Sequence, residues 1–317
     1  MKSRELKVES DISDQESPVL MEIRKQFPFY TIDWATIVYL AVLSLLILIF
    51  SHNQPNWPYF ILYNLFVLVI ILLIVRFLSD EQNPWKRFFR HFYPMFLFTL
   101  LYEETGYLVH TIFPNWFDPW INKVELKIFG DYPTVWMQKI VSVPLSEYMM
   151  MSYFSYYFLM PVLGGLLYFK NRVKEFDQLL LACAVAFYIS YLGFLFMPVE
   201  GPRHAIPDLH NVELVGILFA PMAQYVVNVA GLHGGCMPSS HVAVALVVMI
   251  FAIRYEKVLA WIFTPLILSL FMATVYGRFH YILDVVAGIL VGFLALLICQ
   301  RFLNLKRNQT SVHHEQV

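Results

Sequence analysis

The feature that most constrains this chain is a series of apolar segments long enough to cross a lipid bilayer. A spanning helix needs roughly 18 to 20 apolar residues. Runs near or above that length lie at about 33–51, 57–78, 92–113, 148–169, 178–197, 258–276 and 281–303, and a shorter run covers about 239–253. The sequence therefore predicts an all-α polytopic membrane protein with about eight transmembrane helices.

The composition agrees with this prediction. With 59% hydrophobic and 14% charged residues, the chain is too apolar for a soluble globular domain of 317 residues. Its net charge of −1 gives no indication of a nucleic-acid partner. About thirty mostly polar residues precede the first apolar run, which therefore does not have the form of a cleavable signal peptide and is expected to remain in the mature protein.

The order of polar and apolar segments divides the chain into four parts. Residues 1–30 form a polar tail, 31–91 an N-terminal transmembrane hairpin, 92–303 a membrane core and 304–317 a second tail. A connection within the core contains a further apolar stretch at 213–230. This stretch could be a re-entrant, interfacial or spanning segment, and a ninth span would change the topology.

The basic residues predict an orientation. With the N-terminus in the cytoplasm, the inside segments hold most of the lysines and arginines, and the outside segments hold only Lys123, Lys127, Lys139, Arg203 and Arg278. By the positive-inside rule, both termini are expected to be cytoplasmic. His241 and His280 then face the periplasm, a lumen or the exterior.

The three cysteines do not form a recognisable framework. Cys183 and Cys299 lie inside predicted spans, and Cys236 lies in an outside connection, without the spacing of a metal site. We expect them to be packing residues.

A first polar cluster, Pro238-Ser239-Ser240-His241, opens the short apolar run. A serine before an apolar helix is a good N-cap, and the exposed amides of a helix start bind phosphate oxygens. The cluster therefore suits an anion. The alternative is a capped membrane helix that carries a histidine at its wet end.

A second cluster, His280-Tyr281-Ile282-Leu283-Asp284, stands at the edge of the last span. On a helix, residues four apart share a face, so Asp284 can accept a proton from one ring nitrogen of His280. The other nitrogen is then available as a nucleophile. A purely structural His-Asp hydrogen bond is the alternative, but a second histidine on the same membrane face favours chemistry.

These two clusters resemble the second and third signature motifs of the type 2 phosphatidic acid phosphatase (PAP2) superfamily. The His-Tyr-x-x-Asp form looks most like the branch of inositolphosphotransferases, inositol phosphorylceramide synthases and sphingomyelin synthases. A weaker similarity to inositolphosphotransferase-like members is the turn at 129–133, and the resemblance covers roughly 92–303. It implies a six-helix catalytic core at 92–303.

The resemblance also implies roles for the polar residues. His280 would attack phosphorus to give a phosphohistidine, and Asp284 would orient it. His241 would protonate the leaving oxygen and later deprotonate the acceptor. Ser239 and Ser240 would hold phosphate oxygens.

Two elements of the wider family are missing. The chain has no Lys-x6-Arg-Pro string, and Ala273-Thr274 stands where the third motif begins with Ser-Arg. Because phosphate charge still needs cations in the transition state, we assign that task to Arg203 and Arg278. Arg203 could instead be a solvated loop cation, and Arg278 a snorkelling interface residue.

Other polar residues have less certain tasks. Glu103 and Glu104 lie halfway through a predicted span, where they could contact the substrate headgroup or be protonated or paired within the bundle. The outside histidines His204, His210 and His233 are expected to be loop residues, with a metal site shared with His241 as the alternative.

The expected function is metal-independent transfer of a phosphoryl group or phospho-headgroup on a membrane lipid, without a cofactor. Lipids are the expected partners, and the sequence does not specify an oligomeric state. One alternative is a lipid phosphate phosphatase that releases inorganic phosphate from a phosphatidic acid or an isoprenyl diphosphate. Two rivals from other classes are a lipid transporter or flippase and a metal-dependent hydrolase. A transporter is expected to have polar residues distributed through its spans, whereas here most of them gather at one membrane face.

Overall fold

The computed structural model describes residues 28–79, 82–230 and 233–314 of the chain, so most of the predicted tail at 1–30 lies outside the described residues. All eight predicted membrane segments are helical, as expected where backbone groups must be satisfied within the chain. They are α3 (Thr31–Ile49), α4 (Trp57–Phe77), α5 (Pro84–Leu108), α8 (Val143–Phe169), α9 (Val173–Phe196), α12 (Ser240–Tyr255), α13 (Lys257–Tyr276) and α14 (Ile282–His314).

Six of these helices are long and apolar enough to cross a membrane: α3, α4, α8, α9, α13 and the first 20 residues of α14. Helix α12 has 16 residues, a length of about 24 Å against a hydrocarbon core of about 30 Å. Helix α5 has 25 residues but includes polar residues such as Arg90, Glu103 and Glu104. The all-α polytopic fold is confirmed; α12 is apolar but shorter than these six, and α5 is long enough but more polar.

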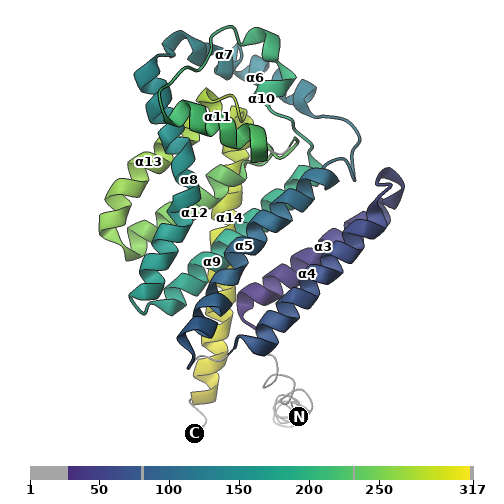
Figure 1. The fold of residues 1–317 in the computed structure, drawn as a ribbon, viewed down its shortest axis with the longest axis vertical. Helices are drawn as coiled ribbons and strands as arrows, with labels where there is room; N and C mark the ends of the chain where they lie inside the picture. The colour runs from purple at the N-terminus through teal and green to yellow at the C-terminus, as the bar shows by residue number, and fades with distance from the viewer. Residues whose placement is uncertain (1–27, 80–81, 231–232, 315–317) are drawn as a thin grey trace, which may run out of the picture.

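Four shorter helices of the described chain gather at one end of the bundle (Figure 1). They are α6 (Asp118–Phe129), α7 (Pro133–Trp136), α10 (Pro202–Ala205) and α11 (Phe219–Ala230), with 3-10 turns at Met137–Ile140 and Pro207–Leu209. A third 3-10 turn, Ser51–Asn53, joins α3 to α4. The apolar stretch at 213–230 contains α11, whose 12 residues span about 18 Å. This helix is too short to cross a bilayer, and it packs against α8.

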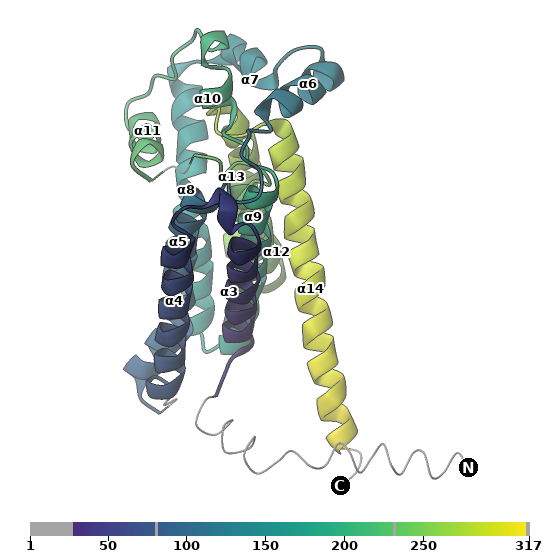
Figure 2. The ribbon, with the colours of Figure 1, turned by 90° about the vertical axis from the view of Figure 1, so that its right-hand side faces the viewer.

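Helix α9 lies at the centre of the bundle, where it contacts α3, α5, α8, α12 and α14. Small residues such as Ala182, Ala184 and Ala186 are fully buried on it and allow its neighbours to approach. Helix α14 begins beneath the short helices and runs to the opposite end (Figure 2). It continues to His314, so no break in the helix marks the predicted tail boundary at 304.

The N-terminal hairpin is joined to the core by a buried ion pair between Asp33 of α3 and Arg90 of α5. The Asp33 carboxylate accepts from Arg90 Nη1 at 3.0 Å, from the backbone N–H of Tyr30 at 2.6 Å and from the Tyr93 hydroxyl. These donors compensate the cost of burying the charge. The hairpin therefore packs against the core through a specific polar contact as well as apolar surface.

The orientation remains a prediction, which single exposed cysteines can test. The first turn of α9 is expected inside and the loop before α11 outside, so Asn211→Cys should react with an impermeant thiol reagent in intact cells and Lys174→Cys should not. Both residues are exposed, and the native cysteines are buried, so the parent protein reports background labelling. The reverse labelling pattern would overturn the predicted orientation.

Candidate active site

A cavity of about 650 Å³ contains the catalytic candidates. Loop residues line one part of it, including the exposed His204 and His233. The other part lies between the membrane helices and is lined by Met95 and Phe98 of α5, Leu159 of α8, Phe187 of α9 and Val248 of α12. The cavity thus joins the polar end of the molecule to an apolar interior.

Both signature clusters meet at this cavity. His241 lies in the first turn of α12, and His280 lies in the turn between α13 and α14. Their ring centroids are 5.7 Å apart, and both residues line the cavity. A phosphorus atom held there would have an imidazole on each side, which is the arrangement that a nucleophile and a general acid need.

His280 and Asp284 are in contact, although the histidine precedes the helix. Nδ1 of His280 lies 3.3 Å from Oδ2 of Asp284, and the same oxygen accepts from the backbone N–H of Tyr281 at 2.9 Å. Asp284 lies in the first turn of α14, which begins at Ile282. The carboxylate therefore holds the turn and the imidazole together.

Burial determines the charge of His280. It lowers the pKa of the imidazole to about 4, and a hydrogen bond with the backbone of Cys236 acts in the opposite direction. Near neutral pH the ring is uncharged, and a neutral nitrogen is the form that can attack phosphorus.

The two serines have different surroundings. Ser239 is fully buried and caps α12, where its hydroxyl accepts from the N–H of Val242 at 3.4 Å. Its own N–H donates to the backbone carbonyl of Asp284 at 3.0 Å, which brings the two clusters together. Ser240 lines the cavity, so it is the better placed of the two for contact with a phosphate oxygen.

The two predicted phosphate-binding arginines also differ. Arg203 lines the cavity, and its Nη2 donates to Asn228 Oδ1 at 2.7 Å, whereas its buried Nη1 has no partner within the described chain. Arg278 has a left-handed backbone, with φ of 62°, and its guanidinium donates to the carbonyl of Val212. Among described residues the cavity lining includes Arg203 but not Arg278.

The paired glutamates of α5 point to different environments. Glu103 lines the cavity. Glu104 is buried, and the amide of Asn64 on α4, with its nitrogen towards α5, donates to both Glu104 carboxylate oxygens at 3.2 Å. The structure therefore leaves Glu103 as the candidate for headgroup contact, whereas Glu104 joins α5 to the N-terminal hairpin.

Of the three loop histidines, two line the cavity and one does not. His210 lies 3.1 Å from the Thr134 hydroxyl, and burial lowers its pKa to about 4. His204 and His233 line the cavity with ring centroids 4.5 Å apart. Neither of them hydrogen-bonds to His241 in the structure; the partner of His233 is Glu200.

Tyrosines of α8 complete the surroundings of His241. The Tyr153 hydroxyl lies 3.3 Å from His241 Nε2, and the rings are stacked at 5.2 Å. Tyr156 packs against the same ring at 4.4 Å. In the sequence these residues are only part of a group of tyrosines inside a predicted span, which gives no signal for a contact with His241.

Two buried carboxylates of α6 were also missed, and they hold the catalytic turns. Asp118 accepts from the backbone N–H groups of Glu200 and Gly201, each at 2.9 Å, and from the Tyr281 hydroxyl at 3.1 Å. Glu125 accepts from the N–H of Leu283 at 3.2 Å, and burial raises its pKa to about 7. An acidic residue in an amphipathic connecting helix gives no sequence signal for such contacts.

Gly201 is required where these segments meet. Its φ is 96°, a conformation that side chains rarely adopt. A Cβ there would lie 2.9 Å from both the sulfur of Cys236 and the carbonyl oxygen of Phe279. Glycine therefore allows the segment before Arg203 to pack directly on the turn that carries His280.

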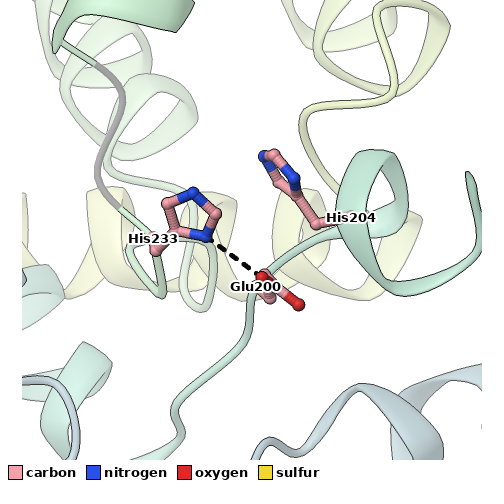
Figure 3. Close-up of side chains that lie close together, drawn as sticks. All are labelled: Glu200, His204 and His233. Atoms are coloured by element: carbon pink, nitrogen blue, oxygen red, sulfur yellow. Dashed lines mark hydrogen bonds and ion pairs between the residues drawn. The ribbon is translucent and has the colours of Figure 1, made fainter.

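Two groups of side chains within the described residues have atoms close enough to share a metal ion. One consists of Glu200, His204 and His233 (Figure 3). The other is buried and consists of Cys236, His280 and Asp284. Metal binding needs the thiolate, and burial strongly raises the pKa of the Cys236 thiol. The thiol also donates to the backbone carbonyls of Glu200 and Phe279, at 3.3 and 3.4 Å, so without a metal ion the second group has hydrogen-bond partners.

Comparison with known families agrees with this geometry. The PAP2 superfamily profile matches residues 119–298, more than half of the chain. The chain belongs to the PAP2 superfamily, which makes it a phosphatase- or phosphotransferase-type enzyme in a helical membrane protein. No curated protein and no solved structure matched the chain.

Loss of the Asp118 carboxylate should impair catalysis from outside the cavity. Asp118→Ala leaves two buried N–H groups and a hydroxyl without an acceptor, so the Glu200–Arg203 segment and the His280 turn should shift. We expect kcat on a lipid phosphate ester to fall by about 10- to 100-fold. Asp208→Ala, which removes an exposed aspartate from the connection that contains Glu200 and Arg203, is the matched control. Equal kcat values for the two variants would contradict this role.

Proposed function

We propose that this protein transfers a phosphoryl group or a phospho-headgroup between membrane lipids through a phosphohistidine on His280, in the manner of an inositolphosphotransferase. The observation that carries the proposal is the pair of imidazoles 5.7 Å apart, the buried His280 with Asp284 behind it and the half-buried His241. The pair faces a cavity that continues into apolar surface. Such a cavity suits a substrate with a phosphate at one end and hydrocarbon at the other.

The reaction follows from the placement of the two rings. His280 donates its Nδ1–H to Asp284, which leaves Nε2 to attack phosphorus. As the P–N bond forms, the P–O bond to the leaving group breaks, and His241 gives its proton to the leaving oxygen. In the second half, His241 takes the proton of the acceptor hydroxyl, whose oxygen displaces His280 from phosphorus. Arg203 and Ser240 neutralise and hold the phosphate oxygens.

The interior of the cavity favours transfer of a polar headgroup over simple hydrolysis. Beyond the imidazoles, the lining includes Thr99, Tyr102, Glu103 and Tyr157. These are more hydrogen-bonding groups than a phosphate alone needs, and a polyhydroxyl headgroup or acceptor would use them. In hydrolysis, water would take the place of the acceptor in the same steps. The predicted orientation puts this chemistry on the extracytoplasmic side.

The division of labour between the histidines can be tested by trapping the intermediate. With an activated phosphate ester, departure of the leaving group needs little acid assistance. His241→Ala should therefore form an acid-labile, base-stable phosphoenzyme that accumulates, because deprotonation of the acceptor is impaired. His280→Ala should form none. Incorporation of labelled phosphate into the purified proteins measures the amount of phosphoenzyme in each variant.

The control for this experiment is His210→Ala, which removes a histidine that contacts Thr134 outside the cavity. This variant should turn over like the parent protein. Label on His241 in a His280→Ala protein would show that the two roles are exchanged. Absence of label from every variant, including His241→Ala, would count against a covalent mechanism.

Comparing two variants tests whether Arg203 stabilises the charge of the phosphate. Arg203→Ala should lower kcat by about 100-fold or more, because one lost donor to developing charge costs a few kcal/mol of barrier. Asn228→Ala removes the hydrogen-bond partner of the guanidinium but keeps the cation, so its kcat should fall much less. Similar decreases of kcat in both variants would show that Arg203 acts by holding α11 in place and not by binding phosphate.

A further inference from the structure

Glu200, His204 and His233 form a group of side chains at the cavity wall that the phosphohistidine mechanism does not use. Nδ1 of His233 lies 3.0 Å from Oε1 of Glu200, and one ligand atom from each of the three residues lies within 4.8 Å of the others. Figure 3 shows the two rings beside one another, with the Glu200 carboxylate below them and its hydrogen bond to His233 drawn as a dashed line. Neither ring nitrogen of His204 has a hydrogen-bond partner among the residues that the structure describes.

The backbone holds these residues together although they are far apart in the sequence. An isolated bridge pairs Val199 with Gly235, so the segments that carry Glu200 and His233 run side by side. Gly234 has φ of 94°, and a Cβ there would lie 2.5 Å from Val109 and 2.9 Å from Trp116. His233 is therefore placed by a turn that packs directly on neighbouring side chains.

The ligand atoms of this group fit zinc better than magnesium or calcium. Two imidazoles and one carboxylate are a ligand set that zinc takes in proteins, with bonds of about 2.0–2.2 Å. In a tetrahedral site, neighbouring ligand atoms are then about 3.4 Å apart. The separation of 3.0 Å between His233 and Glu200 is close to that spacing, and the exposed ring of His204 can complete it by rotation. Magnesium and calcium prefer oxygen ligands and fit the group poorly.

We propose that Glu200, His204 and His233 bind one zinc-class divalent cation at the wall of the catalytic cavity. The three residues all line the cavity, so the fourth coordination position is left for an oxygen from water or from a molecule within it. The ion belongs to a site separate from the His280–His241 pair. Its binding does not depend on which lipid reaction the enzyme performs.

Zinc binding by the full chain tests this proposal without an activity assay. The purified protein, freed of its affinity tag and treated with a chelator, is titrated with zinc by calorimetry. Bound metal is then counted by elemental analysis after gel filtration. We expect about one zinc per chain, and removal of one ligand in His204→Ala, His233→Ala or Glu200→Gln should weaken binding about tenfold or more.

The control is His52→Ala, which removes an exposed histidine from the turn between α3 and α4 and should bind zinc like the parent. A second measurement needs no variant, since bound zinc should protect His204 and His233 of the parent protein from imidazole acylation. Absence of zinc binding by the parent protein would overturn the proposal. So would equal binding by all variants, or acylation of the two rings unchanged by zinc.

Discussion

The active site depends on the buried carboxylate of Asp118, which joins three separate segments of the chain. Its oxygens accept from the N–H groups of Glu200 and Gly201 and from the Tyr281 hydroxyl, at 2.9 to 3.1 Å. The first segment leads to Arg203, and the tyrosine follows His280. Because a buried donor without an acceptor is costly, these segments cannot separate freely. Helix α6, which does not line the cavity, thus helps to set the distance between Arg203 and His280.

The membrane explains where the remaining polar groups lie. Carboxylates at membrane depth require a partner or access to water, and α5 shows both solutions at adjacent positions. Glu103 lines the cavity, whereas Glu104 is buried within reach of the Asn64 amide. Asp33 and Arg90 pair with one another near the starts of α3 and α5, away from the short helices. The proposed catalytic groups His241 and His280 stand at the ends of helices and line the cavity.

The cavity accordingly has three regions with different chemistry. Loop residues at its wall carry the group proposed to bind a metal ion, together with the cation Arg203. The two imidazoles lie at the level where α12 and α14 begin, and tyrosines and apolar side chains line the part between the membrane helices. The proposed substrate would place its phosphate between the two imidazoles, with its hydroxyl groups and hydrocarbon against the part between the membrane helices.

The sequence by itself determined the fold class, the position of the membrane helices and the candidate catalytic motifs. Apolar length and a His-Asp spacing of four are local properties, and local properties can be predicted. Only the tertiary structure decided that Arg203 lines the cavity while Arg278 contacts a loop carbonyl, and that Tyr153 lies against His241. It also brought in Asp118, which bonds to residues 82 to 163 positions away. Contacts over such separations depend on how the helices pack, because hydropathy fixes which segments are buried but not which polar side chains meet.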